Sequence, residues 1–116
     1  MLPLKNRLKS REDFFAVSKQ GSFISAGAVS INFLKNGKDS ARIGFSVGLK
    51  FSKKAVERNL VKRKLRAVAG KILPRLKENI DVIVMVKKIS PKVLSKNLML
   101  DLEEAFRKVN LINSKK

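Results

Sequence analysis

The sequence predicts an α+β sandwich domain, with helices packed on a central, mostly antiparallel sheet that contains one βαβ crossover. Two patterns support this class: stretches in which apolar residues alternate with small or polar ones, and longer stretches in which apolar residues recur at helical spacing. With 116 residues, we expect a single domain over 1–116. The expected order is helix, strand, strand, helix, strand, helix, over residues 11–20, 29–33, 42–47, 52–72, 81–86 and 95–109.

The first helix is predicted over residues 11–20. Ser10 is a favourable N-cap, and Gly21 supplies a C-terminal stop. Phe14 and Val17 would share the inner face of this helix, which leaves Phe15 as the more exposed aromatic residue. The small-residue stretch from 21 to 30 resembles a low-complexity segment.

Two alternating strands follow. The stretch 29–33 places Ser30 and Asn32 on one side and its apolar residues on the other, and 42–47 alternates in the same way around Gly44 and Ser46. The turn signal Asn36-Gly37 lies between them, so the two strands are expected to form a hairpin. The β-branched run at 81–86 is typical of a strand covered on both faces inside the sheet.

The helix predicted over 52–72 is amphipathic and strongly basic on one side. Ser52 is its expected N-cap, and Val61, Leu65, Val68 and Ile72 form its apolar stripe. Between Lys53 and Arg66 there are seven basic residues and one acid, a net charge of +6 in 14 residues. Guanidinium and ammonium groups on a rigid helix suit a phosphate backbone; the alternative is a solvated face, in which charges usually alternate in sign. Ser95 is expected to cap the last helix, which repeats its apolar residues up to Val109.

The composition indicates a polyanionic partner. Lys and Arg number 27 against 9 Asp and Glu, a net charge of +18, and 44% hydrophobic residues are enough to build a folded core. With no Cys and no His, thiol nucleophiles and histidine acid–base chemistry are excluded. No apolar run approaches the ~20 residues that span a bilayer. We expect a soluble, cytoplasmic protein with no membrane partner and no small-molecule substrate.

Several segments of the chain resemble the protein subunit of bacterial ribonuclease P. In Glu57–Arg66, Arg-Asn, Lys-Arg and Arg follow one another at the spacing of the family's signature helix. Arg42–Val47 and Asp81–Lys88 flank it, and Asp13-Phe14 with Val17 and Gly21 resembles the family's first helix, so the likeness covers almost the whole chain. It implies the same element order with a left-handed crossover, whereas crossovers in general are right-handed in about 98% of cases.

The resemblance also implies two RNA-binding sites. The basic helix would contact the catalytic RNA subunit, through Lys53, Lys54, Arg58, Asn59, Lys62, Arg63 and Arg66. A cleft between the first helix and the sheet would hold the single-stranded 5′ leader of precursor tRNA, through Phe14, Phe15, Ser30, Asn32, Ser46 and Lys50. The small and polar positions of the two alternating strands supply a floor for this cleft. An exposed phenylalanine would stack a leader base, with core packing as the alternative for Phe14.

The function that the resemblance implies is an RNA-binding subunit of ribonuclease P that assists removal of the 5′ leader. Catalysis would reside in the RNA subunit, with no catalytic side chain in the protein and with Mg²⁺ held mainly by the RNA subunit and the substrate. A small ribosomal-type or chaperone-like RNA-binding protein is the main alternative. A nuclease acting alone would need clustered carboxylates, yet the acids are scattered and only Asp101 and Glu104 share a predicted helix face.

Overall fold

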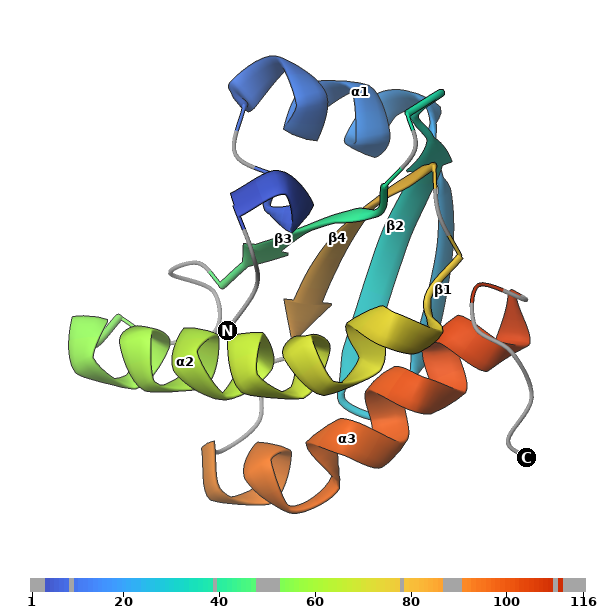
Figure 1. Ribbon diagram of the computed structural model, residues 1–116. Coiled ribbons are helices and arrows are strands. Elements are labelled where there is room, and N and C mark those ends of the chain that lie inside the picture. The colour runs from blue at the N-terminus through green and yellow to red at the C-terminus, as the bar shows by residue number, and fades with distance from the viewer. Residues whose placement is uncertain are drawn as a thin grey trace.

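The computed structural model describes residues 4–8, 10–38, 40–47, 53–77, 79–86, 91–109 and 111. Its elements confirm the predicted α+β class and show how the helices are distributed over a sheet (Figure 1). Along the chain they are η1 (Leu4–Asn6), α1 (Arg11–Gln20), β1 (Ser22–Ala26), β2 (Val29–Lys35), β3 (Arg42–Ser46), α2 (Ala55–Ile72), η2 (Leu73–Arg75), β4 (Ile80–Val86) and α3 (Pro91–Lys108).

The sheet has the strand order β1-β2-β4-β3. β1 pairs with β2 and β2 with β4 in antiparallel fashion, whereas β3 and β4 are parallel. The predicted interior position of the 81–86 run is therefore confirmed, because β4 has a neighbour on each side. Val82 and Val84 are fully buried and Ile83 is 3% exposed, which explains the unbroken apolar run.

The predicted hairpin between 29–33 and 42–47 is wrong, because β4 lies between β2 and β3. The Asn36-Gly37 turn is present, with Gly37 at a φ of 69°, but two hydrogen bonds of Asn36 run towards β4. The main-chain N–H of Asn36 donates to the main-chain oxygen of Asn79, and the side-chain Nδ2 of Asn36 donates to Oδ1 of Asp81 at 2.7 Å. The turn therefore directs the chain past β4 to the far edge of the sheet.

The small-residue stretch 21–30 forms a strand and a tight turn that the sequence pattern did not reveal. β1 pairs with β2, and the turn that connects them contains Gly27, which has a φ of 56°. A Cβ at position 27 would clash with the carboxylate of Asp101 on α3, so a glycine is required there both for space and for backbone conformation. The same carboxylate accepts a hydrogen bond from the Ala28 amide at 2.9 Å, which ties the hairpin to α3.

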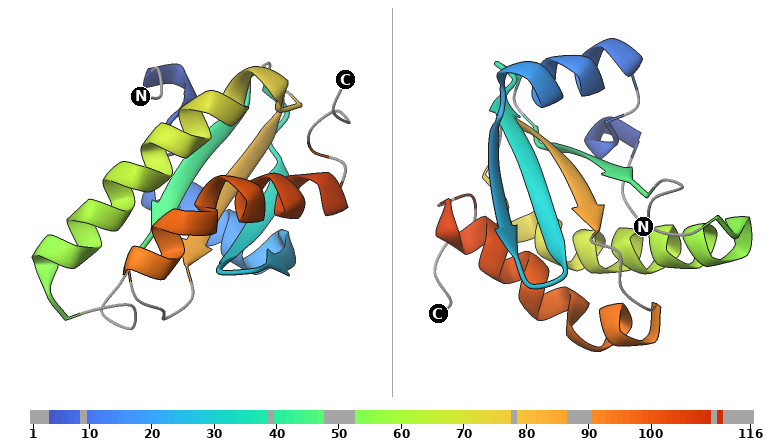
Figure 2. Two further views of the ribbon diagram at one scale, coloured as in Figure 1. Left: turned by 90° about the horizontal axis from the view of Figure 1, so that it is seen from below. Right: turned by 180° about the vertical axis from the view of Figure 1, so that it is seen from behind.

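The helices form layers on both sides of the sheet. α2 and α3 cover one face and α1 lies over the other (Figures 1 and 2). The main core lies under α2 and α3, where Leu65, Leu102 and Phe106 are fully buried against β-strand residues such as Ile31. A second apolar cluster under α1 contains Leu8, Val17 and Ile83.

α2 forms the connection between the parallel strands β3 and β4. In the left view of Figure 2, α2 lies in front of the sheet, both strands point downward and β4 is to the right of β3. If this view is turned so that the strands point upward, β4 lies to the left of β3, and the connecting helix α2 lies in front of both strands. The crossover is left-handed, as the family resemblance implied and against the general preference.

The helix ends follow the predictions in part. Ser10 Oγ accepts hydrogen bonds from the amides of Glu12 and Asp13, which confirms the N-cap of α1. α2 begins at Ala55 with Lys54 at the cap position, and the predicted cap Ser52 lies outside the described residues. The predicted cap at Ser95 is wrong, because α3 begins at Pro91, a residue well suited to the first turn of a helix.

Candidate nucleic-acid interface

The basic face of α2 is built by the burial of its opposite side. Val61, Leu65, Ala69 and Ile72 are fully buried in the core, so the rest of the helix surface points outward. Among the seven residues predicted to contact the catalytic RNA, the exposed ones are Lys53, Lys54, Asn59, Arg63 and Arg66. The other two, Arg58 and Lys62, are half-buried. The structure thus brings all seven to one helix and the residues just before it, as the periodicity predicted.

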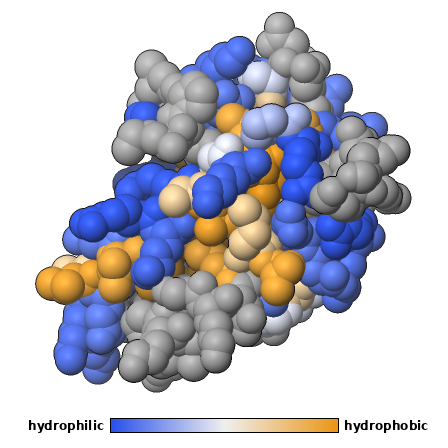
Figure 3. Space-filling model, turned by 60° about the horizontal axis from the view of Figure 1, so that its bottom comes forward, coloured by the Kyte–Doolittle hydropathy of each residue, from blue (hydrophilic) through white to orange (hydrophobic). Residues whose placement is uncertain are grey.

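The N-terminal half of α2 extends beyond the sheet, which makes its cationic side chains accessible to a large partner (Figures 1 and 2). This half also carries exposed apolar side chains: Val56 is 79% exposed and Leu60, one helical turn later, is 39% exposed. Figure 3 views this side of the molecule and shows hydrophobic surface next to hydrophilic surface. The surface therefore combines cationic groups with apolar contact area.

The second predicted site lies on the face of the sheet that carries Asn32, Ile83 and Gly44, here named the α1 face. Strand register places these residues in one row across the sheet. A parallel row contains Ser30, Met85 and Ser46. The prediction that the polar and small residues of the two alternating strands share a face is confirmed. The expectation that the two strands are adjacent is wrong, because Ile83 and Met85 of β4 lie between them.

Phe14 packs against the floor of this face. A Cβ at Gly44 would lie 2.5 Å from Cζ of Phe14 and 3.0 Å from the main-chain oxygen of Leu8. The missing side chain at position 44 therefore makes room for the Phe14 ring, which is half-buried. Phe15 is 63% exposed, as predicted, and the Nζ of Lys19 lies 5.6 Å from its ring centroid.

An ion-pair network holds α1 over the sheet. Arg42 on β3 bonds to Asp81 on β4 and lies 3.1 Å, Nη1 to Oδ2, from Asp13 on α1. The side-chain hydrogen bond to Asp81 is the main cause that raises the pKa of Arg42, so the guanidinium remains charged. Asn36 donates a further hydrogen bond to the same Asp81 carboxylate. α1, β3 and β4 are thereby tied together at the edge of the α1 face.

The predicted leader-site residues are only partly assembled on this face. Ser46 is exposed and Asn32 half-buried, while Ser30 is 8% exposed and so offers little contact surface. Lys50 lies outside the described residues. One aromatic residue on this face was missed by the sequence analysis: Phe23 on β1 is 62% exposed and is the register partner of Asn32. Because Ile24 follows it, the alternation that would have revealed this strand is weak.

Two carboxylates of α3 serve structural roles. Asp101 anchors the β1–β2 turn, and Glu103 forms an ion pair with Arg75. Among the residues that the structure describes, no group of three or more His, Cys, Asp or Glu side chains is placed to hold a metal ion. Within the same residues, no helix is long and apolar enough to cross a membrane.

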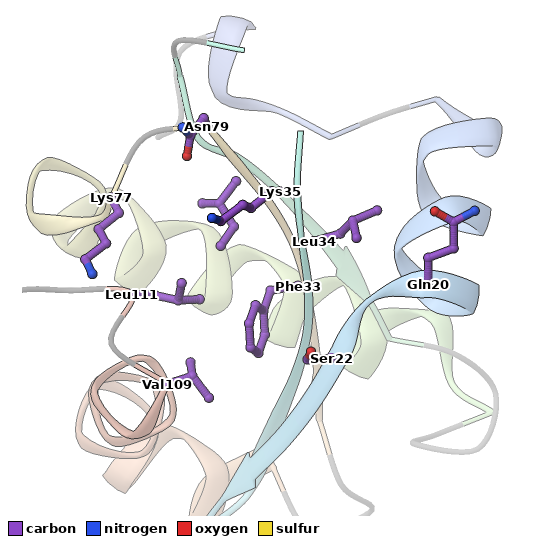
Figure 4. Close-up of a pocket in the computed structure, with 10 residues that line it drawn as sticks. Gln20, Ser22, Phe33, Leu34, Lys35, Lys77, Asn79, Val109 and Leu111 are labelled. Atoms are coloured by element: carbon purple, nitrogen blue, oxygen red, sulfur yellow. The ribbon is translucent and has the colours of Figure 1, made fainter. Parts of the chain in front are cut away.

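A hollow of about 510 Å³ lies away from these predicted residues, where the C-terminal ends of α1 and α3 approach the end of β2 (Figure 4). Its apolar wall includes Phe33 and Val109, and Lys35 and Lys77 contribute ammonium groups. None of the predicted RNA-binding residues lines it. It therefore lies outside the residues predicted for either surface, although Gln20 and Leu34 belong to the side of the sheet that α1 covers.

Comparison with known proteins identifies a consistent set of relatives. The family model described as Ribonuclease P matches residues 2–110. The "Ribonuclease P protein component" of Pseudanabaena sp. is 35% identical over 114 residues, covering 97% of this chain and 98% of that protein. The protein of the same description from Dictyoglomus turgidum is 39% identical over 85 residues, covering 73% of this chain and 71% of that protein.

Solved structures show the same fold. The RNase P protein of Staphylococcus aureus superposes with a TM-score of 0.81 at 24% identity, covering 93% of this chain and 98% of that chain. The RNase P protein of Thermotoga maritima superposes with a TM-score of 0.70 at 27% identity, covering 95% of this chain and 98% of that chain. The architecture is thus shared across nearly the full length of both chains.

Proposed function

The chain belongs to the ribonuclease P protein family, and from this premise we propose that it binds the catalytic RNA subunit and the 5′ leader of precursor tRNA through two different surfaces. Its part in the enzyme is to position the substrate leader and to offset the repulsion between the phosphates of the two RNAs. The observation that carries this proposal is the segregation of charge: the cations of α2 face outward on an element that extends past the sheet.

The basic surface of α2 is the proposed contact with the catalytic RNA. Arg63 and Arg66 are exposed and project from a helix whose other side is anchored by fully buried residues. Because the helix is already anchored, its backbone need not be ordered when these side chains bind phosphate. The exposed amide of Asn59, one turn before Arg63, is suited to a 2′-hydroxyl or a base edge, groups that distinguish RNA from a simple polyanion.

The α1 face is the proposed leader site. Its floor has apolar residues at the centre and polar ones on the flanking strands, and aromatic side chains stand at its margins. A single-stranded RNA presents stacking faces, base edges and phosphates, which this mixture of groups can contact. Lys50, which follows β3, is proposed to contact a leader phosphate.

Hydrolysis of the phosphodiester is assigned to the RNA subunit, with Mg²⁺ held by that RNA and by the substrate. The acids described above are engaged in structural contacts, and the sequence has no histidine to act as a general base. The proposal includes no catalytic side chain from this chain. Its location is proposed to be the cytoplasm, together with its RNA partners. The ribosomal-type alternative receives no support from the relatives found.

The docking surface is tested by measuring RNA affinity as a function of salt. Replacing Arg63 and Arg66 with Gln is expected to weaken binding to the catalytic RNA and to reduce the slope of log K against log salt by about two, because each arginine is expected to neutralise one phosphate. A variant with Lys38→Gln and Arg107→Gln removes the same charge from exposed positions outside α2. If both variants change the slope equally, overall charge binds the RNA and the α2 surface has no special role.

A further inference from the structure

We propose that Phe23 on β1 is a stacking platform for an unpaired nucleotide of the leader, with the amide of Asn32 beside it to bond the base edge. This inference rests on the proposed function, because it places a particular group on the leader surface. Phe23 and Asn32 are directly opposite each other in the β1–β2 ladder, so their side chains lie on the same face with Cβ atoms about 5 Å apart.

The register also shows which face this is. Asn32 pairs with Ile83, and Ile83 belongs to the apolar cluster of Leu8 and Val17 under α1. Phe23 therefore lies on the α1 face, on the opposite side of the sheet from α2 and α3. Its neighbour Ile24, which points to the other side, packs against the main core. Phe23 is thus directed away from the core that stabilises its own strand.

Phe23 is largely exposed to solvent. A phenylalanine buries about 150–250 Å² when it packs fully, yet 62% of this side chain remains in contact with solvent. Single exposed apolar residues are common on proteins, so exposure alone carries little weight. Here the exposed ring belongs to an edge strand and has a hydrogen-bonding amide as its cross-strand partner. A ring beside an amide is a combination that fits a nucleobase, which has both a π-face and polar edges.

The charge of the molecule favours RNA over a second copy of this chain as the occupant. A net charge of +18 opposes the docking of a second copy of the chain on this strand. A cation is also close to β1: Nζ of Lys108 on α3 lies 3.5 Å from the main-chain oxygen of Ser25. Lys108 therefore supplies positive charge at the edge of β1, the strand that carries Phe23.

Phe23 and Phe14 contact different parts of the leader in this proposal. Phe14 lies against Gly44 on β3, whereas Phe23 is in the same row at the opposite edge of the sheet, three strand spacings or about 14 Å away. One base cannot span this separation. We infer that a leader long enough to cross the sheet reaches Phe23 only with its distal nucleotides.

The test compares precursor tRNAs with leaders of one and of ten nucleotides, bound to the complex of the catalytic RNA with wild-type protein or with Phe23→Ala. The variant is expected to lower affinity for the long-leader substrate by about fivefold or more, because about fivefold is the smallest loss expected when one stacked base is removed. Affinity for the short-leader substrate should be unchanged. Phe23→Trp should restore affinity, whereas Phe23→Leu should not, because leucine keeps apolar area without a ring. Leu100→Ala, at a residue of α3 that is 66% exposed, is the matched control.

The outcomes distinguish stacking by Phe23 from leader binding by the protein as a whole. Equal losses with both leaders, or rescue by leucine, would overturn the stacking role. No loss in Phe23→Ala, while wild-type protein still raises affinity for the long leader, would overturn this inference and leave the proposed function intact. If wild-type protein raises affinity for neither substrate, the proposed function itself fails. A Phe23→Ala protein that forms dimers less readily than wild type would show that the ring serves self-association.

Discussion

Arg42 and Asp81 form a bidentate pair that joins the two parallel strands at the margin of the α1 face. Nε of Arg42 lies 2.8 Å from Oδ1 of Asp81, and Nη2 lies 2.7 Å from Oδ2. The side chains are 18% and 7% exposed, so the pair is largely shielded from water. Because Nη1 also contacts Asp13 on α1, the same guanidinium links both strands to the helix that covers the proposed leader site.

Replacing Asp81 with Ala is expected to lower the free energy of unfolding by about 3 kcal/mol, since it leaves a mostly buried guanidinium without its main partner. Urea denaturation at pH 7 measures this loss, with the exposed Glu104→Ala as control. Because the pair raises the pKa of Arg42, the guanidinium stays charged at every pH below its ordinary pKa, and its contribution to stability is lost only as the pH rises through the elevated pKa. The difference between wild type and variant should therefore be the same at pH 7 and pH 9. A loss below about 0.5 kcal/mol, the range of an exposed ion pair, would contradict this account of the network.

Gly44→Ala is expected to destabilise the protein by about 1–3 kcal/mol, because the added methyl meets the ring of Phe14 and the main chain of Leu8. Shortening the ring partner relieves part of that clash. In a double-mutant cycle, Phe14→Leu with Gly44→Ala should therefore cost less than the sum of the two single changes. Thermal denaturation of the four proteins measures the coupling. Additive losses would mean that the ring and the glycine do not contact each other in solution.

Leu60→Arg is expected to tighten binding to the catalytic RNA. Leu60 is partly exposed on the α2 surface among cationic side chains, so an arginine there is expected to add one further phosphate contact. The slope of log K against log salt should become steeper by about 0.9. Leu100→Arg adds the same charge on α3 and should leave the slope nearly unchanged. An equal gain from both changes would argue against a localised docking surface.

Asp101→Ala is expected to reduce stability by about 1–3 kcal/mol and to leave the chemistry of leader removal unchanged. Its carboxylate accepts the Ala28 amide, and that partly buried donor loses its partner in the variant. The rate of cleavage by the complex should show the same dependence on Mg²⁺ concentration as with wild-type protein, measured well below the melting temperature. A shift of the Mg²⁺ requirement would implicate this acid in metal binding.

The sequence predicts the elements that have a strong periodic pattern. The buried stripe of α2 is recognisable from its helical period, and β4 is recognisable from its unbroken run of apolar, mostly β-branched residues. β1 escapes prediction because its five residues combine serines with two consecutive apolar side chains. The order of strands depends on which edges pair, and the turn after β2 has side-chain bonds to β4 that no local pattern contains.

In the candidate site, too, local groupings of residues can be predicted from the sequence, whereas groupings that depend on strand pairing cannot. The cations of α2 are neighbours in sequence and share one helix, so their grouping is local information. The α1 face collects residues from all four strands, and the proximity of Phe23 to Asn32 depends on the register between them. The small size of Gly44 suggested open space for a leader, but in the structure that space is occupied by the ring of Phe14.

The central claim is that this chain assists an RNA catalyst in removing the 5′ leader. The most direct measurement combines the purified protein with a bacterial ribonuclease P RNA and a 5′-labelled precursor tRNA at low Mg²⁺, and compares cleavage with and without protein. We expect faster release of an intact leader with protein present and no cleavage by the protein alone. Cleavage at an unchanged rate, with the protein bound to its cognate RNA, would contradict the account.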